Sequence, residues 1–272
     1  MIKPFLRLVD VLIAQPLSQG DLLRSLVRTP AFLLDFRRYQ QLSRGEAKVR
    51  DWYPCLHDKT ATTPFEPHYF FQSAWAARKI AESHPTVHVD VGSQINLIAP
   101  LSAFVPVEFV EIRPLAVCLS GLKSVTGSIL KLPYSDQSVH SISSLHVIEH
   151  IGLGRYGDPL DPEGTYKACR ELSRVLAVGG NLYITVPIGR HRIEFNAHRI
   201  VEPKTIIRYC DGLELVDFSI VDDKGSFHEH VSLSNCHGMS YGAGLFHFSR
   251  KESLFLNATS FQTGSQVPRS VS

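Results

Sequence analysis

The spacing of apolar and polar positions changes near residue 85. From there to about residue 250, short apolar runs that end at glycine or proline alternate with longer amphipathic stretches. Such runs are typical of buried parallel strands, and such stretches are typical of helices that cover a sheet. The pattern predicts strands at 87–91, 107–111, 124–127, 139–144, 181–186, 213–221 and 244–249. It predicts helices at 71–83, 94–104, 162–176 and 203–210.

Strand–helix alternation predicts an α/β fold, in which a doubly wound, mostly parallel sheet of seven strands has helices on both faces. Before this region, residues 1–50 predict two or three short amphipathic helices, one of them opened by Pro30. Residues 51–70 are rich in proline and aromatic residues and predict a loop packed on the main domain. We therefore expect three parts: a helical and loop extension (1–70), the α/β domain (71–255) and a polar, disordered tail (256–272).

Charge is distributed unevenly along the 272 residues. The net charge of +2 is too small to indicate nucleic-acid binding. Residues 1–50 nevertheless hold nine basic and four acidic residues. A basic, partly apolar segment of this kind is typical of contact with an acidic membrane surface.

The cysteines indicate a reducing compartment. There are five, an odd number, and none forms a CxxC pair. Asp10 interrupts the apolar start of the chain, which argues against a signal peptide, and no apolar run reaches the ~18 residues of a membrane span. We expect a cytoplasmic protein, with membrane association through residues 1–50 and a homodimer both left open.

The carboxyl ends of the first two predicted strands carry the parts of a nucleotide pocket. Asp90-Val91-Gly92-Ser93 closes the first strand, and Glu111 closes the second, 21 residues after Asp90. Gly92 lets the backbone approach a ligand, and a carboxylate at the second position can accept both hydroxyls of a ribose. The alternative is that Asp90 and Glu111 are surface acids at strand ends.

Two later segments extend this pattern: VTGSILKLPYSDQSVHSISSLHVIEHI (125–151) and RELSRVLAVGGNLYITVPIG (170–189). The succession resembles class I S-adenosylmethionine (SAM)-dependent methyltransferases over roughly residues 85–250. The resemblance implies SAM as cofactor, bound by Asp90, Gly92, Ser93, Glu111, Ser128, Ile129 and His146. Two departures, GSQINLIAP in place of a glycine-rich run and Ser128 in place of an acid, predict weaker SAM binding or a different nucleotide.

Two polar loops follow the fourth and fifth predicted strands, at 150–159 and 187–199. Because both leave the sheet at one edge, we expect both to overhang one pocket. For a reaction there we expect catalytic roles for His150 and His198 as bases and for Asp158 as their orienting group. We expect the acceptor to be bound by Arg155, Tyr156, Asn196 and Arg199. The alternative is that these arginines and Asp158 form internal salt bridges that hold the loops.

The amino-acid sequences of these loops also resemble those of a narrower family. EHIGLGRYGDPLDPEG, VPIGRHRIEFNAHR and VDDKG resemble the uncharacterised domain-of-unknown-function family number 268, across most of residues 85–225. The resemblance implies a methyltransferase-like fold and no established reaction.

Metal binding is not expected. Residues 146–150 match the HxxEH pattern of some zinc peptidases, but that chemistry needs a helix and a third ligand. The cluster around His228 and His237 matches no regular zinc spacing.

We therefore expect a SAM-dependent methyltransferase that acts on a small polar acceptor, such as a sugar or glycolipid. The alternatives are another enzyme on this fold that uses a sugar nucleotide, and a non-catalytic binding protein that has kept the fold.

Overall fold

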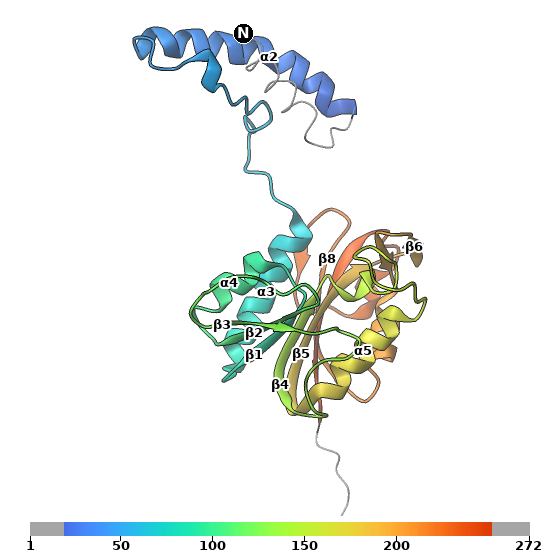
Figure 1. The fold of residues 1–272 in the computed structure, drawn as a ribbon. Coiled ribbons are helices and arrows are strands. Elements are labelled where there is room, and N and C mark those ends of the chain that lie inside the picture. The colour runs from blue at the N-terminus through green and yellow to red at the C-terminus, as the bar shows by residue number, and fades with distance from the viewer. Residues whose placement is uncertain (1–18, 252–272) are drawn as a thin grey trace, which may run out of the picture. The chain divides into compact units, whose positions relative to one another are not determined.

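The structure is a computed structural model that describes residues 19–251 (Figure 1). The chain divides into two compact units, Met1–Phe65 and Glu66–Ser272. The first eighteen residues and the predicted tail at 256–272 lie outside the described residues.

In the first unit, α2 (Gln19–Leu42) is one helix of 24 residues that runs through Pro30, followed by the short η1 (Val49–Asp51). The prediction that Pro30 opens a second helix is wrong. A proline inside a helix costs about 3 kcal/mol, so contacts on both sides of it have to hold the helix. Before Pro30, Arg28 donates to the Leu56 carbonyl at 2.9 Å. After it, Phe32 and Phe36 pack edge-on against Trp52, with ring centroids 5.4 and 5.0 Å away.

The second unit contains an eight-stranded sheet in the order β3-β2-β1-β4-β5-β10-β8-β9. From the first edge to the last, the strands are β3 (Leu122–Thr126), β2 (Val107–Glu111), β1 (His88–Val91), β4 (Val139–Leu145), β5 (Leu176–Ile188), β10 (Gly242–Ser249), β8 (Glu214–Val221) and β9 (Phe227–His228). Strands β3 to β5 are parallel, and β10 runs antiparallel to both of its neighbours. The α/β, mostly parallel prediction is confirmed.

The sheet has one more strand than predicted. The extra strand, β9, is only two residues long and pairs with β8 through a tight turn. In that turn, the Asp222 carboxylate accepts hydrogen bonds from the backbone N–H groups of Lys224 and Ser226, both at 2.9 Å. Because this strand is formed by a side-chain-stabilised turn rather than by an apolar run, the apolar pattern does not show it.

Helices cover both faces of the sheet (Figure 1). Helices α3 (Pro67–Ser83) and α4 (Ile95–Leu101) lie on one face, and α5 (Gly164–Val175) lies on the other. Helix α6 (Pro203–Tyr209) packs with α5 in the core cluster of that second face. The remaining short elements are η2 (Ile148–His150), β6 (Arg192–Glu194), β7 (His198–Ile200) and η3 (Leu233–Cys236).

Helix α3 begins at Pro67, four residues before the predicted helix. Glu66 caps it by accepting a hydrogen bond from the Tyr69 N–H at 2.7 Å, and proline at the first helical position costs nothing there. This start places His68 and Tyr69 on the first turn of a helix rather than in a loop.

The order of the strands reverses between β1 and β4. The chain passes from β1 outward to β2 and β3, and then returns to β4 on the other side of β1. At such a switch point the connections leave in opposite directions, so a crevice opens beyond the carboxyl ends of the strands.

A buried polar network joins β1 to β4 at this point. His88 bonds through both ring nitrogens, to the hydroxyls of Ser141 at 2.8 Å and Ser143 at 2.9 Å. Ser143 donates to the Asp90 carboxyl group, which also accepts from the Ser93 N–H at 3.0 Å. His88 and Asp90 are both fully buried, so each would be costly without these partners.

Burial shifts both ionisable groups of this network toward their neutral forms. It lowers the pKa of His88 to about 3. It raises the pKa of Asp90 to about 6, against the hydrogen bonds from Ser143 and Ser93, which lower it. Because the pKa of an unfolded aspartate is about 3.9, the folded chain keeps a proton between about pH 4 and 6 that the unfolded chain has released. This contribution to stability is present below about pH 4 and is lost as the pH rises through 6.

We predict that Asp90→Asn removes this pH dependence. The free energy of unfolding of the wild type, relative to that of the variant, falls by on the order of 2 kcal/mol as the pH rises from about 4 to about 6.5. Urea denaturation at a series of pH values measures the difference, with the exposed Asp211→Asn as control. A pH-independent difference would contradict the assignment of Asp90 as a buried, neutralised carboxyl group.

Candidate functional site

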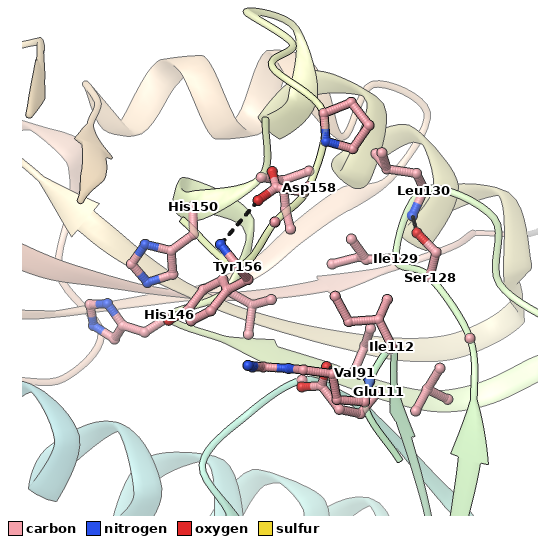
Figure 2. A pocket seen from close by; sticks show the side chains of 18 residues that line it. Val91, Glu111, Ile112, Ser128, Ile129, Leu130, His146, His150, Tyr156 and Asp158 are labelled. Carbon is pink, nitrogen blue, oxygen red and sulfur yellow. Dashed lines mark hydrogen bonds between the residues drawn. The ribbon is translucent and has the colours of Figure 1, made fainter. Parts of the chain in front are cut away.

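A cavity of about 330 Å³ lies at the carboxyl ends of β1, β2 and β4 (Figure 2). Its volume falls in the range of small-molecule and cofactor sites. Figure 2 shows His146 and His150 at one end and Ser128, Ile129 and Leu130 at the other. Glu111, Arg113, Tyr156 and Asp158 also line it, together with the backbone of Gly92.

Gly92 and Glu111 form the floor of this cavity. Gly92 has a φ of 72°, and a Cβ atom there would lie 3.2 Å from Cγ1 of Val147 and 3.9 Å from Oε2 of Glu111. The Glu111 carboxylate accepts a hydrogen bond from the Arg113 N–H at 3.2 Å. Gly92 therefore leaves the backbone without a side chain beside the Glu111 carboxylate. The Arg113 N–H, just after the end of β2, holds that carboxylate in place.

Five of the seven predicted cofactor residues line the cavity: Gly92, Glu111, Ser128, Ile129 and His146. Asp90 and Ser93 do not. Asp90 is fully buried in the network between β1 and β4, and Ser93 accepts a hydrogen bond from the Leu145 N–H at 2.9 Å. Their place is beneath the cavity, where they support the β1 end rather than line it.

The two polar loops meet, as their common edge requires. The Ala197 carbonyl, in the second loop, accepts hydrogen bonds from Nδ1 of His150 at 2.6 Å and from Nη1 of Arg155 at 3.2 Å. Asn196 donates to the Leu153 carbonyl at 3.4 Å. Only the first loop lines the cavity, and the second packs behind it.

Arg199 and Asp158 hold the first loop in place. Arg199 is buried and donates to the carbonyls of Ile151 at 2.6 Å and Asp161 at 3.0 Å. Asp158 accepts from the Gly152 N–H at 2.6 Å and from the Tyr156 N–H at 3.3 Å. Although burial acts to raise the pKa of Asp158, backbone donors such as these hold it below its usual value. These contacts support the structural alternative for both residues, with hydrogen bonds to the backbone in place of salt bridges.

The two predicted bases have different surroundings. His150 lines the cavity, and burial lowers its pKa. His198 lies behind it, with Nε2 3.2 Å from the Glu194 carboxylate. The two rings are in edge contact, with centroids 6.3 Å apart. Of the two, His150 is the one that a ligand in the cavity can reach.

Tyr156 lines the cavity, and Arg155 lies beside its ring without lining the cavity. The Arg155 guanidinium lies 5.2 Å from the centroid of the Tyr156 ring, and that of Arg113 lies 5.1 Å from it. The side chains of Arg113, Arg155 and Tyr156 are all exposed. Two guanidinium groups beside a tyrosine ring can bind an anionic or hydroxyl-rich ligand at the mouth of the cavity.

The sequence analysis did not identify Glu149 as a site residue. Its side chain is 2% exposed, and Oε1 lies 2.8 Å from Nδ1 of His146. His146 itself has a φ of 53°, a left-handed conformation that costs a non-glycine residue of order 1–3 kcal/mol and clusters at functional sites. The pair belongs to the HxxEH pattern at residues 146–150, which the sequence analysis interpreted only as a zinc motif. Among the described residues, no group of three or more His, Cys, Asp or Glu could hold a metal ion.

Comparisons with known proteins concern the family and the fold. The profile of a family described as "Caenorhabditis protein of unknown function, DUF268" matches residues 130–233, which confirms the narrower resemblance. No curated protein matches the sequence.

Two solved structures with a TM-score of 0.50 illustrate the similarity of fold, and a third matches with a lower score. The [4+2]-cyclase SpnF matches with a TM-score of 0.50 and 13% identity, over 66% of this chain and 81% of its own. A putative sarcosine dimethylglycine methyltransferase from Galdieria sulphuraria matches with a TM-score of 0.50 and 17% identity, over 79% and 97%. The N-methyltransferase NodS from Bradyrhizobium japonicum, in complex with S-adenosylhomocysteine, has a TM-score of 0.47 and 16% identity, over 79% and 98%. The chain has the class I methyltransferase-like fold.

We predict that Arg199→Ala loosens the first loop and lowers stability. Each buried carbonyl that loses its donor costs about 1–3 kcal/mol, so we expect a loss of at least about 2 kcal/mol. Amide hydrogen exchange should accelerate across residues 150–161, while the exposed Arg208→Ala leaves it unchanged. Unchanged exchange in the first variant would show that Arg199 does not hold the loop.

Proposed function

We propose that the chain is a SAM-dependent methyltransferase that acts on a small polar acceptor. The observation that carries the proposal is the floor of the cavity, where a glycine with positive φ lies beside the Glu111 carboxylate at the β1–β4 switch point. This is the place at which open α/β sheets bind nucleotides.

The residues present fit the cofactor. Glu111 offers a carboxylate for the ribose hydroxyls, and Gly92 lets the backbone approach the amino-acid part. Ile112, Ile129 and Leu130 give the far end of the cavity an apolar wall for the adenine ring. SAM would supply an activated methyl group, so the protein's task is to orient the acceptor and to manage its proton.

We infer that the acceptor carries hydroxyl groups, as a sugar or glycolipid does. Tyr156, Arg155 and Arg113 at the rim offer a ring face and hydrogen-bond donors for such a molecule. Asn196 bonds to the backbone of the first loop, and Arg199 is buried, so both would act through the loop.

The proposal includes a cytoplasmic location and contact with a membrane surface. The five cysteines are free thiols, which favours the cytoplasm. No helix in the described part of the chain is long and apolar enough to cross a membrane. The exposed Leu26, Val27 and Leu34 of α2, among basic residues, support contact with a membrane surface.

A second candidate is an enzyme on this fold that uses a different nucleotide. The observation that favours it is the run GSQINLIAP, in which α4 begins at Ile95 without the family's further glycines. The [4+2]-cyclase SpnF illustrates that the fold serves reactions other than methyl transfer.

We predict that Glu111→Ala weakens SAM binding by about 10-fold to 100-fold or more, because two hydrogen bonds to a charged group are lost. Equilibrium dialysis with radiolabelled SAM measures the change, with the exposed Glu229→Ala as control. Wild-type affinity in Glu111→Ala would refute the site. Binding of UDP-glucose but not SAM by the wild type would favour the second candidate.

A further inference from the structure

His146 and Glu149 form a buried pair at the end of the cavity nearest the polar loops. Their side chains are 6% and 2% exposed, and Nδ1 of His146 lies 2.8 Å from Oε1 of Glu149. The pair spans the end of β4 and η2, so a three-residue spacing on a short 3-10 helix brings the groups together. The left-handed backbone of His146 turns its ring toward this carboxylate and the cavity.

The hydrogen bond defines which ring nitrogen carries the proton. A carboxylate accepts hydrogen bonds, so Nδ1–H of His146 donates to Glu149 and Nε2 keeps its lone pair. Among the groups that the structure describes, neither Nε2 of His146 nor Oε2 of Glu149 has a hydrogen-bond partner. A buried acceptor without a donor is costly, which indicates that a donor arrives from a ligand.

His150 has a second free imidazole nitrogen near this pair. Nδ1 of His150 donates to the Ala197 carbonyl, so Nε2 of His150, 3.7 Å from Oε1 of Glu149, also keeps its lone pair. Burial, with the Glu149 charge second, raises the pKa values of Tyr69 and Tyr241, so both phenols stay protonated. Of the two histidines, only His146 has its other ring nitrogen hydrogen-bonded to a carboxylate, which makes its free nitrogen the more basic one.

Aromatic rings pack around the His146 ring, whose Nε2 atom is buried. The His68 ring stacks on His146 with centroids 5.8 Å apart, and the Tyr69 ring lies 5.5 Å away at 51°. Both rings belong to the first turn of α3, where Tyr69 is 39% exposed. An acceptor that reaches Nε2 takes the place of part of this cover, and gains a ring face to lie against.

We propose that His146 is the catalytic base of this site, that Glu149 is its positioning residue, and that the methylated group is a hydroxyl. The proposal rests on the proposed function. A hydroxyl oxygen is a weak nucleophile until its proton is taken, whereas a neutral amine already offers its lone pair, so a buttressed base is of most use to a hydroxyl.

The hydroxyl proton passes to Nε2 of His146 while the hydroxyl oxygen forms a bond to the methyl carbon. The carbon–sulfur bond breaks, and its electron pair stays on sulfur and neutralises the sulfonium. The products are a methyl ether, S-adenosylhomocysteine and an imidazolium that the Glu149 carboxylate stabilises, and the proton then leaves to water.

The test is the tautomer of His146 in the full-length protein. Long-range ¹H–¹⁵N spectra of histidine-labelled protein report which ring nitrogen is protonated, and His146→Gln identifies the signal. We expect the Nδ1–H form in the wild type and in the exposed control Glu229→Gln. Glu149→Gln should lower the ratio of Nδ1–H to Nε2–H by about tenfold or more, because the charge-assisted hydrogen bond is lost. An Nε2–H form in the wild type would overturn the proposal even if the variant did not fold.

SAM binding separates this proposal from the one on which it rests. Calorimetric titration should give Glu149→Gln a SAM affinity within about twofold of the wild type, because Glu149 does not line the cavity and acts on the acceptor through His146. Loss of SAM binding in folded Glu149→Gln, with the wild type still binding, would assign the pair to the cofactor and overturn the base role alone. A wild type that does not bind SAM would overturn the proposed function and the catalytic role together, whatever the tautomer.

Discussion

The pairing of β1 with β4 is the constraint on which the rest of the molecule depends. The parallel pairing sets Val89 opposite Ile142 and Asp90 opposite Ser143, and the serine–histidine–aspartate network ties the same strands through side chains. A polar network inside a sheet is stabilising only when every member has a partner, so it fixes the register of the two strands. That register places the end of β1, with Gly92, beside the end of β4, with His146.

The cavity follows from this junction. The strand order reverses there, so no connection crosses the carboxyl ends of β1 and β4, and the connections on either side form the walls. Glu111 comes from one side, and the loop held by Arg199 and Asp158 comes from the other. Because the supporting hydrogen bonds are made to backbone groups, the loop is arranged before any ligand arrives, which lowers the entropic cost of binding.

The sequence predicted the features that depend on residues close together in the chain, such as strand bounds and glycines at strand ends. The strand Val107–Glu111 has its predicted bounds, and Gly92 and Glu111 lie together, because apolar runs and glycine at a strand end are direct signals. Tertiary contacts decided the rest. Contacts with residues 52–56 before and after Pro30 hold α2 as one helix, and a side-chain-stabilised turn creates β9. Asp90 is beneath the cavity because the serines of β4 offer it partners, which no pattern within β1 could indicate. The pairing of His146 with Glu149 depends on the left-handed turn after β4, which a histidine at that place does not signal.

The proposed function depends on SAM binding in the cavity between Gly92, Glu111 and the first polar loop. This binding can be measured by calorimetric titration of the folded, full-length protein with SAM and with S-adenosylhomocysteine. We expect both to bind with micromolar affinity, a free energy of about −8 kcal/mol, at one site per chain. A folded protein that takes up neither molecule would contradict the proposed function.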